Sequence, residues 1–379
     1  MRILVVSRSW PSNERSGVSL VASEHVKMLI SAGHDISIVG SFPAIVNETL
    51  KVTNKYFVSS CGSGSLYSPA SVDCKQLSSI FIAENPDLII VEAWQTALTD
   101  AAIDIGFNMS LPVLMISHGV SLHKLSNSIL DILKMILWIP YRLRLGSKIS
   151  KLSAITTLDF ESSSLRFYDR QIALKLGIPV INLLNSPVNW LYNLNTFTER
   201  KSQILVVGYY SPIKNQLRAI DLIPGLPEFL KFKFIGPKNG RYFRSCVRRV
   251  SDLGLSDRVT FNEDSEINIA EEVSTSLMVL STSKTEVLPV ILLEAMASGT
   301  PFVATSVGAV SSLRAGIIAN DIDGQRMAIS SLANDRDLWS RTSLIGRKEY
   351  ELRYSYESIS ISLKHAINIA IKNSKEFYG

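Results

Sequence analysis

The sequence predicts an α/β protein with two parallel β-sheets, each in a domain of its own. Short apolar runs alternate with segments of helical periodicity along the chain, which is the pattern of βαβ units. With 379 residues, 46% hydrophobic and 19% charged, the chain is long and apolar enough for two cores. A polar stretch at residues 186–203 interrupts the alternation and indicates a linker. We therefore expect two Rossmann-like domains with the active site in the cleft between them.

Six strands are expected on each side of this linker. Those of the first half are Arg2–Val6, Asp35–Val39, Leu88–Val91, Val113–Ser117, Ala154–Thr157 and Val180–Leu184. Those of the second half are Ile204–Gly208, Phe232–Gly236, Arg258–Phe261, Leu277–Leu280, Phe302–Ala304 and Gly316–Ala319. From Tyr356 to about Lys372 the apolar spacing predicts an amphipathic helix. We place the domains at 1–190 and 191–355, with a closing helix at 356–379.

The composition excludes several classes of protein. Three cysteines without paired spacing, and no clustered histidines, disfavour a zinc site or a disulfide framework and fit a reducing cytoplasm. Met1–Val6 is too short for a signal sequence, and no apolar run approaches the ~20 residues of a spanning helix. The net charge is +5, but no aromatic-basic pattern points to nucleic acid. We expect a cytoplasmic protein, soluble or peripheral to a membrane.

Two glutamates, Glu286 and Glu294, are the most informative residues of the chain. Pro289 stands where a helix would begin, and Gly299 stands where it would end. Apolar runs on both sides place Glu286 in a loop at the carboxyl end of a strand and Glu294 on the following helix. Ligands of open parallel sheets bind at this edge. A lone helical glutamate is usually a solvated or ion-paired surface residue, so the inference depends on the pair and its setting.

The start of the same helix offers the backbone N–H groups of Val290 and Ile291 to an anion. Carboxylates that accept hydrogen bonds from hydroxyls would thus lie beside a cradle for phosphate. This combination suits a sugar joined to a nucleoside diphosphate.

The segment from Glu286 to Pro301 resembles the signature of the retaining family-4 glycosyltransferases of the GT-B fold. That signature reads E-G-F-P, an apolar stretch, and then E-A-M-A-x-G-x-P; this chain keeps both acids, the first proline, Ala-Met-Ala and the closing glycine and proline. The resemblance implies two Rossmann-like domains whose parallel sheets face an interdomain cleft, with the closing helix packed on the N-terminal domain. It also implies that Glu286 contacts hydroxyls of the transferred sugar and that Glu294 contacts the ribose.

The chain departs from the signature at Val287, where the family has glycine. Its branched side chain crowds the sugar site, which leaves the identity of the donor open. Val287 and Leu288 are nevertheless assigned to the donor site together with the helix start that follows them.

A second motif runs from Gly208 through Tyr209 to Lys214. We expect Lys214 in the first turn of a helix, where a cation opposes the helix dipole by about 0.3–1 kcal/mol unless an anion is bound. The resembled family has a lysine here that binds donor phosphate, and an arginine directly after the glycine. Tyr209 occupies the arginine position and cannot neutralise a diphosphate bidentately. Three alternatives follow: Lys214 and the helix start suffice, Arg218 compensates, or the donor is held weakly or turnover is lost.

Three more positions are assigned to the site through the resemblance. Gly17 precedes a helix and by itself indicates a plain turn, but the family has a glycine loop here that faces the donor diphosphate and the acceptor. His118 follows a strand and by itself could be an idle loop residue. The family has a histidine here beneath the acceptor and the anomeric centre, so we assign it hydrogen bonding and positioning. Gly236 resembles the family's turn near the nucleobase.

Two features have competing interpretations. Asp321 and Asp323 could hold a metal, but their neighbours favour a polar turn, and we expect neither a metal nor a cofactor. The stretch Ile129–Leu145 mixes apolar residues with basic ones. It is either a helix lying on an anionic membrane surface, on the inner face of the plasma membrane, or a buried helix with solvated charges.

The function expected from the resemblance is retaining transfer of a hexose from a nucleotide-sugar to an acceptor hydroxyl. The acceptor would be a glycan or a lipid-linked saccharide, with surface polysaccharide synthesis as the family's commonest setting. Two alternatives stay open: a GT-B epimerase or phosphorylase, and a catalytically silent GT-B subunit that binds a partner transferase or a glycan. Tyr209 and Val287 are the residues that favour the silent subunit.

Overall fold

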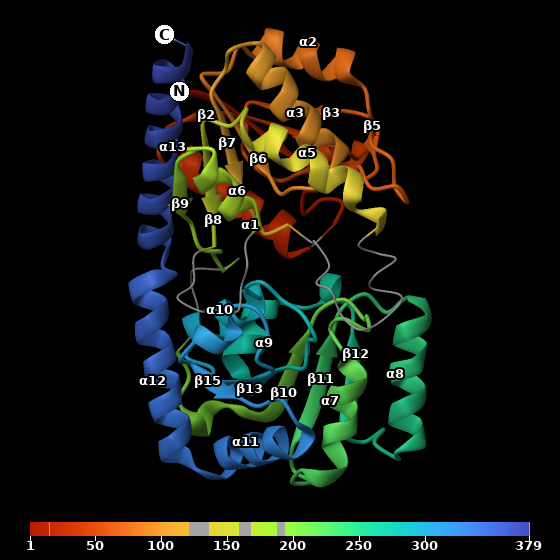
Figure 1. Cartoon of the computed structure of the whole chain (residues 1–379). Coiled ribbons are helices and arrows are strands. Elements are labelled where there is room, and N and C mark those ends of the chain that lie inside the picture. Colours follow the sequence, from red (N-terminus) through yellow and green to blue (C-terminus); the bar gives the residue numbers. More distant parts are fainter. Residues whose placement is uncertain (15, 121–135, 159–167, 188–193, 379) are drawn as a thin grey trace. The chain divides into compact units, whose positions relative to one another are not determined.

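The computed structural model describes residues 1–14, 16–120, 136–158, 168–187 and 194–378 (Figure 1). The chain forms two compact units. Of the described residues, the first unit contains 1–158, 168–185 and 357–378, and the second contains 186–187 and 194–356. Each unit is built on one parallel sheet, so the predicted α/β class is confirmed.

The sheet of the first unit has seven strands in the order β3-β2-β1-β6-β7-β8-β9. Their bounds are β1 (Arg2–Ser7), β2 (Asp35–Gly40), β3 (Asn54–Phe57), β6 (Leu88–Glu92), β7 (Val113–Ile116), β8 (Ala154–Thr157) and β9 (Val180–Asn182). A separate antiparallel pair joins β4 (Ser60–Cys61) to β5 (Ser71–Val72). All six predicted strands are present. The sequence missed β3, a partly exposed edge strand, and the pair β4–β5, whose strands have two residues each.

Helices cover both faces of this sheet. They are α1 (Gly17–Ser31), α2 (Cys74–Glu84), α3 (Ala97–Asn108), α5 (Ile139–Ile149), α6 (Tyr168–Lys175) and α13 (Tyr356–Tyr378), with a 3-10 turn η1 (Pro43–Asn47). Alternate residues of β1, Leu4 and Val6, pack in one core with side chains of α2, α3 and α5. The closing helix α13 lies beside α1, and Leu363 of α13 and Met28 of α1 line the same groove.

The second unit has a six-stranded parallel sheet in the order β12-β11-β10-β13-β14-β15. The strands are β10 (Lys201–Val207), β11 (Lys231–Ile235), β12 (Val259–Asn262), β13 (Ser276–Ser281), β14 (Phe302–Ala304) and β15 (Gly316–Ile318). All six were predicted within a few residues of their bounds. The predicted linker at 186–203 overlaps the start of β10, which extends to Lys201 although its first two residues are polar and exposed.

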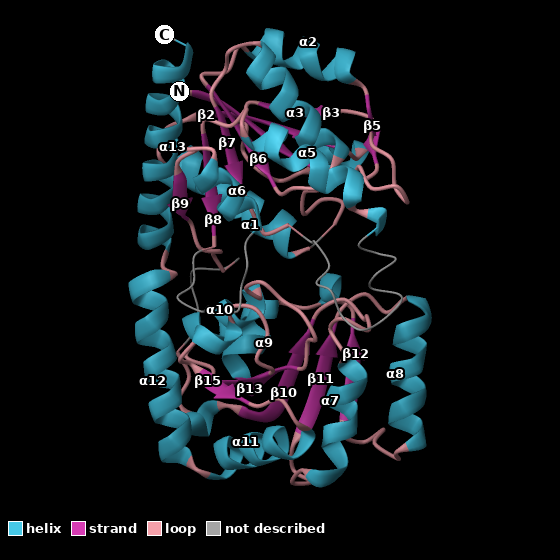
Figure 2. Ribbon diagram, in the orientation of Figure 1, coloured by secondary structure: helices cyan, strands magenta, loops and turns pink. Residues whose placement is uncertain are grey.

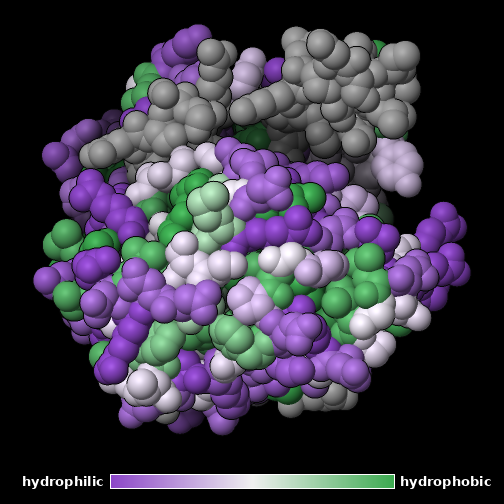
Figure 3. Space-filling view, turned by 90° about the horizontal axis from the view of Figure 1, so that it is seen from below, coloured by the Kyte–Doolittle hydropathy of each residue, from purple (hydrophilic) through white to green (hydrophobic). Residues whose placement is uncertain are grey.

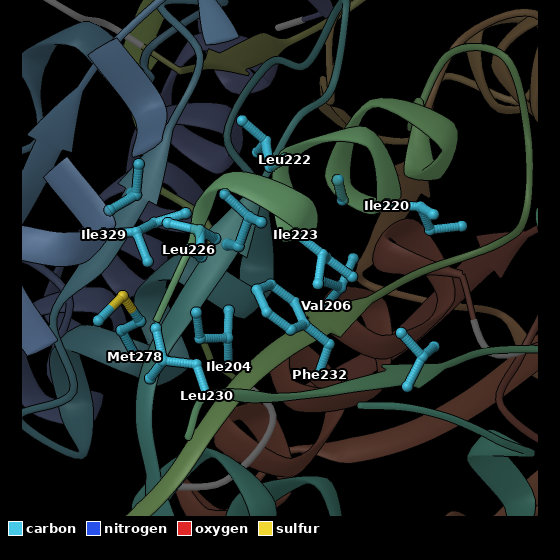
Figure 4. Close-up of a cluster of buried hydrophobic side chains, with 14 of the residues drawn as sticks. Ile204, Val206, Ile220, Leu222, Ile223, Leu226, Leu230, Phe232, Met278 and Ile329 are labelled. Carbon is cyan, nitrogen blue, oxygen red and sulfur yellow. The ribbon is translucent and has the colours of Figure 1, made fainter. Parts of the chain in front are cut away.

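The second sheet also lies between helices (Figure 2). They are α7 (Gln216–Leu222), α8 (Gly240–Asp252), α9 (Ile269–Thr275), α10 (Val290–Ala297), α11 (Ile322–Asn334) and α12 (Arg336–Arg353), with 3-10 turns η2 (Phe197–Glu199), η3 (Ile223–Gly225), η4 (Asp264–Glu266) and η5 (Val310–Ser312). Figure 4 shows the core of this unit, where Ile204 and Phe232 of the sheet meet Ile220 of α7 and Ile329 of α11. On the face seen in Figure 3, hydrophilic residues surround small groups of hydrophobic ones, as on an ordinary solvated surface.

Candidate functional site

The order of strands in the second sheet places the candidate site at a topological switch point. β10 lies in the middle, and the chain adds β11 and β12 on one side before it returns to add β13 on the other. The loops that leave the carboxyl ends of β10 and β13 therefore diverge and leave room for a ligand between them. Lys214 lies in the loop after β10, and Glu286 lies in the loop after β13.

The structure brings these two side chains into direct contact. Nζ of Lys214 lies 2.5 Å from Oε1 of Glu286, and the hydroxyl of Ser283 donates to the same oxygen over 2.9 Å. Both side chains are partly buried, with 32% of Lys214 and 14% of Glu286 exposed. They line a small pocket together with Thr282, Pro289 and Ile291. The sequence did not single out Ser283, although it stands three residues before Glu286.

The expectation that Lys214 lies in the first turn of a helix is wrong. Helix α7 begins at Gln216, and Asn215 before it has the left-handed φ of 56°, which interrupts helical geometry. Lys214 therefore lies in the preceding turn, where its backbone N–H donates to Ser211 Oγ over 3.2 Å. Its ammonium group is held by Glu286 and is not part of the first helical turn.

Glycine is required where the loops after β10 and β11 meet. A Cβ on Gly236 would lie 2.4 Å from the carbonyl oxygen of Gly208, too close for any side chain. Gly208 itself has a φ of 142°. Gln216, which the sequence did not predict, holds this turn by donating to the carbonyl of Tyr209 over 2.8 Å. Gly208 and Gly236 thus shape the backbone of the candidate site at the carboxyl ends of the neighbouring strands β10 and β11.

The structure places Tyr209 at the surface, with 40% of the residue exposed. Arg218, the candidate to replace the missing arginine, is bonded elsewhere. Its Nε donates to Oε1 of Gln325 over 3.0 Å, and its Nη2 donates to the carbonyl of Asn320. In this structure Arg218 therefore supports the start of α11, and Lys214 remains the candidate cation for a diphosphate.

The backbone of the Glu286 loop is fixed by the chain after β14. The N–H of Ala309 donates to the carbonyl of Val287 over 2.8 Å. Gly308 has a φ of 56°, and a Cβ there would lie 2.0 Å from the carbonyl oxygen of Glu286. Leu288 is buried at 4% exposure. The loop can thus hold Glu286 in place only because residue 308 is glycine.

Helix α10 begins as predicted. Pro289 is its N-cap residue and makes no side-chain capping bond, so the first N–H groups, at Val290 and Ile291, are those that a bound anion would meet. Glu294 lies further along α10 and is buried, with 7% exposed. Gly299 follows the helix with a φ of 63°, which ends it as expected.

The remaining predicted residues lie in the first unit. Gly17 is the first residue of α1, behind the N-cap Ser16. His118 follows β7, and its Nε2 lies 2.8 Å from Oε2 of Glu92, whose other oxygen lies 2.9 Å from Nδ1 of His25. Burial raises the pKa of Glu92, but the electrostatic interaction with His25 and the hydrogen bonds from both histidines outweigh it and lower the pKa to about 2. Sequence reasoning missed Glu92, although an acid directly after the apolar run Leu88–Val91 was a signal.

The aspartate pair begins a helix and does not form the polar turn expected. Asp321 caps α11 by accepting from the N–H of Gly324 over 2.7 Å, and Asp323 pairs with Arg326 at 3.5 Å. Within the described ranges, no group of three His, Cys, Asp or Glu side chains is placed to hold a metal ion. No helix in the described part of the chain is long and apolar enough to cross a bilayer.

Comparison with known proteins assigns most of the second unit to a family. Residues 194–315, which contain Lys214, Glu286 and Glu294, match the model of the family described as glycosyl transferases group 1. This segment is a group 1 glycosyl transferase domain. The predicted family and enzyme class, a glycosyltransferase, are thereby confirmed. Retention of configuration and the family-4 subclass stay predictions.

Solved glycosyltransferase structures share the fold over nearly the whole chain. HepE of Anabaena, solved with UDP and glucose, is 16% identical, and the alignment covers 97% of this chain and 99% of HepE at a TM-score of 0.69. Sucrose-phosphate synthase of Thermosynechococcus elongatus is 14% identical over 97% and 98% of the two chains, with a TM-score of 0.74. A TarM variant of S. aureus, solved with fondaparinux, alpha-GlcNAc-glycerol and UDP, is 12% identical over 97% and 99%, with a TM-score of 0.69. No curated protein matches the sequence. At these identities the similarity shows the GT-B fold.

Proposed function

We propose that this group 1 glycosyltransferase moves a hexose from a nucleoside diphosphate sugar to an acceptor hydroxyl with retention of configuration. The acceptor would be a glycan or a lipid-linked saccharide, and the setting would be surface polysaccharide synthesis at the cytoplasmic side of a membrane. The observation that carries the proposal is the meeting of Lys214 and Glu286 beside the start of α10, at the switch point of the second sheet. The ammonium group of Lys214 and the N–H groups at the start of α10 suit the phosphates of such a donor, and the carboxylate of Glu286 suits its sugar hydroxyls.

The contact between Lys214 and Glu286 suggests how the donor is received. A diphosphate would draw the ammonium group of Lys214 toward itself, and Glu286 would then be free to accept from sugar hydroxyls. Ser283 would continue to hold the carboxylate, because its hydroxyl already donates to Oε1. Glu294, buried on α10, would bind the ribose.

In the reaction, the bond between the anomeric carbon and the phosphate oxygen breaks as the acceptor oxygen attacks from the same face. The departing phosphate takes the proton of the acceptor hydroxyl. Stabilising the negative charge on this phosphate is then the main task of the protein. Lys214 and the N–H groups of Val290 and Ile291 would perform it, and we propose that no metal or cofactor takes part.

The experiment is incubation of the purified protein with a panel of nucleotide-sugars, followed by measurement of nucleoside diphosphate release. Glu294→Ala tests the site, and Glu351→Ala is its matched control, since Glu351 is an exposed glutamate paired with Arg347 on α12. We expect release from one donor, lost in Glu294→Ala and kept in Glu351→Ala. Absence of donor binding in the wild-type protein would contradict the assigned site.

A silent subunit is the second candidate, because Tyr209 is exposed where an arginine would meet the diphosphate. Such a protein would bind a donor without consuming it, even with the correct acceptor. The double substitution Tyr209→Arg with Val287→Gly restores the residues of the resembled family. If turnover appears only in that variant, the natural chain is the silent form; turnover in the wild type excludes it.

For the membrane, the described part of the basic apolar stretch shows a helix with two different faces. On α5, Tyr141 and Leu145 are buried in the core, while Leu143 is 80% exposed and Ile139 is 45% exposed, with Arg144 exposed beside them. Residues 129–135 of the stretch, including Lys134, lie outside the described residues. We propose that the exposed face of α5 contacts an anionic membrane surface.

Sedimentation with lipid vesicles tests this contact. We expect the protein to bind phosphatidylglycerol vesicles and not phosphatidylcholine vesicles, and we expect Leu143→Glu to reduce the bound fraction. Leu352→Glu is the control, since Leu352 is equally exposed, at 77%, on α12 of the second unit. Equal loss in both variants would contradict a specific role for α5.

A further inference from the structure

Glu92 ends β6, which pairs with β1 at the switch point of the first sheet and with β7 on its other side. Its side chain is fully buried, at 0% exposure, and it lies between two histidines, His25 of α1 and His118 after β7. An ionised carboxylate only accepts hydrogen bonds, and out of water it needs donors on both oxygens. The two nitrogens that face it, Nδ1 of His25 and Nε2 of His118, therefore each carry a hydrogen.

The chain around this carboxylate is firmly held. Ala93, directly after β6, has a left-handed φ of 68°, which is costly for a residue other than glycine. Trp94 donates from its indole to Asp169 over 2.9 Å. Ser117, directly before His118, donates its hydroxyl to the same carboxylate. The ends of β6 and β7 are thus tied to one another through buried acids.

We propose that Glu92 is a positioning residue that holds His118 as the Nε2–H tautomer and leaves its Nδ1 for the substrates. The proposal rests on the proposed function and on the role that the sequence resemblance implies for His118, hydrogen bonding beneath the acceptor and the anomeric centre. A histidine that commits one nitrogen to a carboxylate has its tautomer fixed by that bond. In the neutral ring the other nitrogen is an acceptor, which suits a saccharide hydroxyl.

His25 determines which of the two histidine rings changes its tautomer when Glu92 is replaced by the isosteric glutamine. In Glu92→Gln the amide accepts through one atom and donates through the other, so one of the two rings must offer a bare nitrogen. If His25 did so, its hydrogen would move to Nε2, which is buried and has no hydrogen-bond partner in the part of the chain that the structure describes. A buried donor without an acceptor is unfavourable. His118 is therefore the ring that switches, and its Nδ1 becomes a donor.

The test combines histidine NMR with kinetics on the full chain. In ¹⁵N-histidine-labelled protein, the His118 signals are assigned by their loss in His118→Gln. We expect the hydrogen on Nε2 in the wild type and on Nδ1 in Glu92→Gln. We also expect kcat to fall by roughly 10- to 100-fold, the range typical of changing the hydrogen-bond partner that orients a functional histidine. KM for the donor should stay within about twofold, because Lys214 and Glu286 hold the donor in the second unit.

His25→Gln is the matched control, because it alters the other side of the same carboxylate and keeps the bond to His118. Its His118 tautomer should match the wild type. A bare Nε2 on His118 in the wild-type protein would overturn the proposal without any variant. Normal kcat in Glu92→Gln, in a protein that does consume a donor, would overturn the positioning role alone. If the wild type neither binds nor consumes any donor, the proposed function itself fails.

Discussion

Gly308 shows how one residue can decide whether the donor loop forms. Its left-handed φ of 56° already disfavours a side chain, and a Cβ would lie 2.0 Å from the carbonyl of Glu286. We expect Gly308→Ala to displace Glu286 and weaken donor binding by about tenfold or more, a loss of roughly 1.4 kcal/mol. Titration calorimetry with the donor found by the release assay measures this.

Gly254→Ala is the control for that substitution. Gly254 has a similar φ of 66°, but a Cβ there would meet nothing within 4 Å. This variant should lose about 1–2 kcal/mol of stability from backbone strain alone and keep its donor affinity. If both variants bound the donor equally, the contact between Gly308 and the Glu286 loop would have no role in the site.

At the residue scale, the sequence predicted which loops carry the candidate residues better than it predicted their contacts. Glu286, Lys214 and the start of α10 were assigned because each follows a predicted strand and belongs to a recognisable motif. The contact between Lys214 and Glu286 was not predicted, and neither was the position of Glu92 between His25 and His118. Such contacts depend on which strands become neighbours, and that order is set by packing of the whole sheet.

Helix α3 carries two acids one turn apart whose pKa values shift in opposite directions. Burial raises the pKa of Asp100 to about 6, from an ordinary value near 3.8. Burial also acts on Asp104, but its hydrogen bonds with Lys148 and Lys151 outweigh it and lower the pKa. The two residues therefore predict opposite dependences of stability on pH.

Asp100→Asn should remove a loss of stability that develops as the pH rises. Below pH 4 the Asp100 carboxyl is protonated in both the folded and the unfolded state. Between pH 4 and 6 it ionises in the unfolded chain first, so the free energy of unfolding of the wild type falls by about 3 kcal/mol relative to that of the variant. Asp104→Asn should show the opposite sign, because its stabilisation is present above pH 4 and is lost as the pH falls through the lowered pKa. Urea unfolding between pH 3 and 7 measures both. Parallel curves for the two variants would contradict the assignment.

The closing helix α13 offers a second test at the scale of elements. Leu363 is 1% exposed and packs within the first unit, whereas Ile361 on the same helix is 70% exposed. We expect Leu363→Ala to lower the free energy of unfolding by about 2–5 kcal/mol. Ile361→Ala should change it by less than about 0.5 kcal/mol. Comparable losses of unfolding free energy in both variants would mean that α13 does not pack through the face that carries Leu363.

Elements with strong periodicity were predicted, and short or exposed ones were not. The twelve expected strands all formed. Most are apolar runs that parallel packing buries, although β15, at the edge of its sheet, has no fully buried residue. β3 lacks such a run, and the start of α7 depends on the left-handed Asn215, which no periodic pattern reveals. The apolar spacing after Tyr356 did predict α13, although the helix continues to Tyr378.

At the scale of the whole molecule, two separate cores predict two separable unfolding transitions. One core gathers around Val6 and Phe81 in the first unit, and the other around Ile204 and Phe232 in the second. All the assigned site residues except Gly17 and His118 lie in the second unit. A nucleoside diphosphate should therefore stabilise the second unit and leave the first almost unchanged.

Scanning calorimetry with UDP, GDP and ADP tests this division. At a concentration of 100 Kd, the nucleotide that binds should stabilise one transition by about 2.7 kcal/mol and leave the other in place. Lys214→Ala should abolish the shift, while Leu363→Ala should lower only the transition of the first unit. A single transition that moves as a whole with nucleotide would contradict independent units. It would mean that donor binding and the first unit, with Glu92 and His118, are coupled through one cooperative structure.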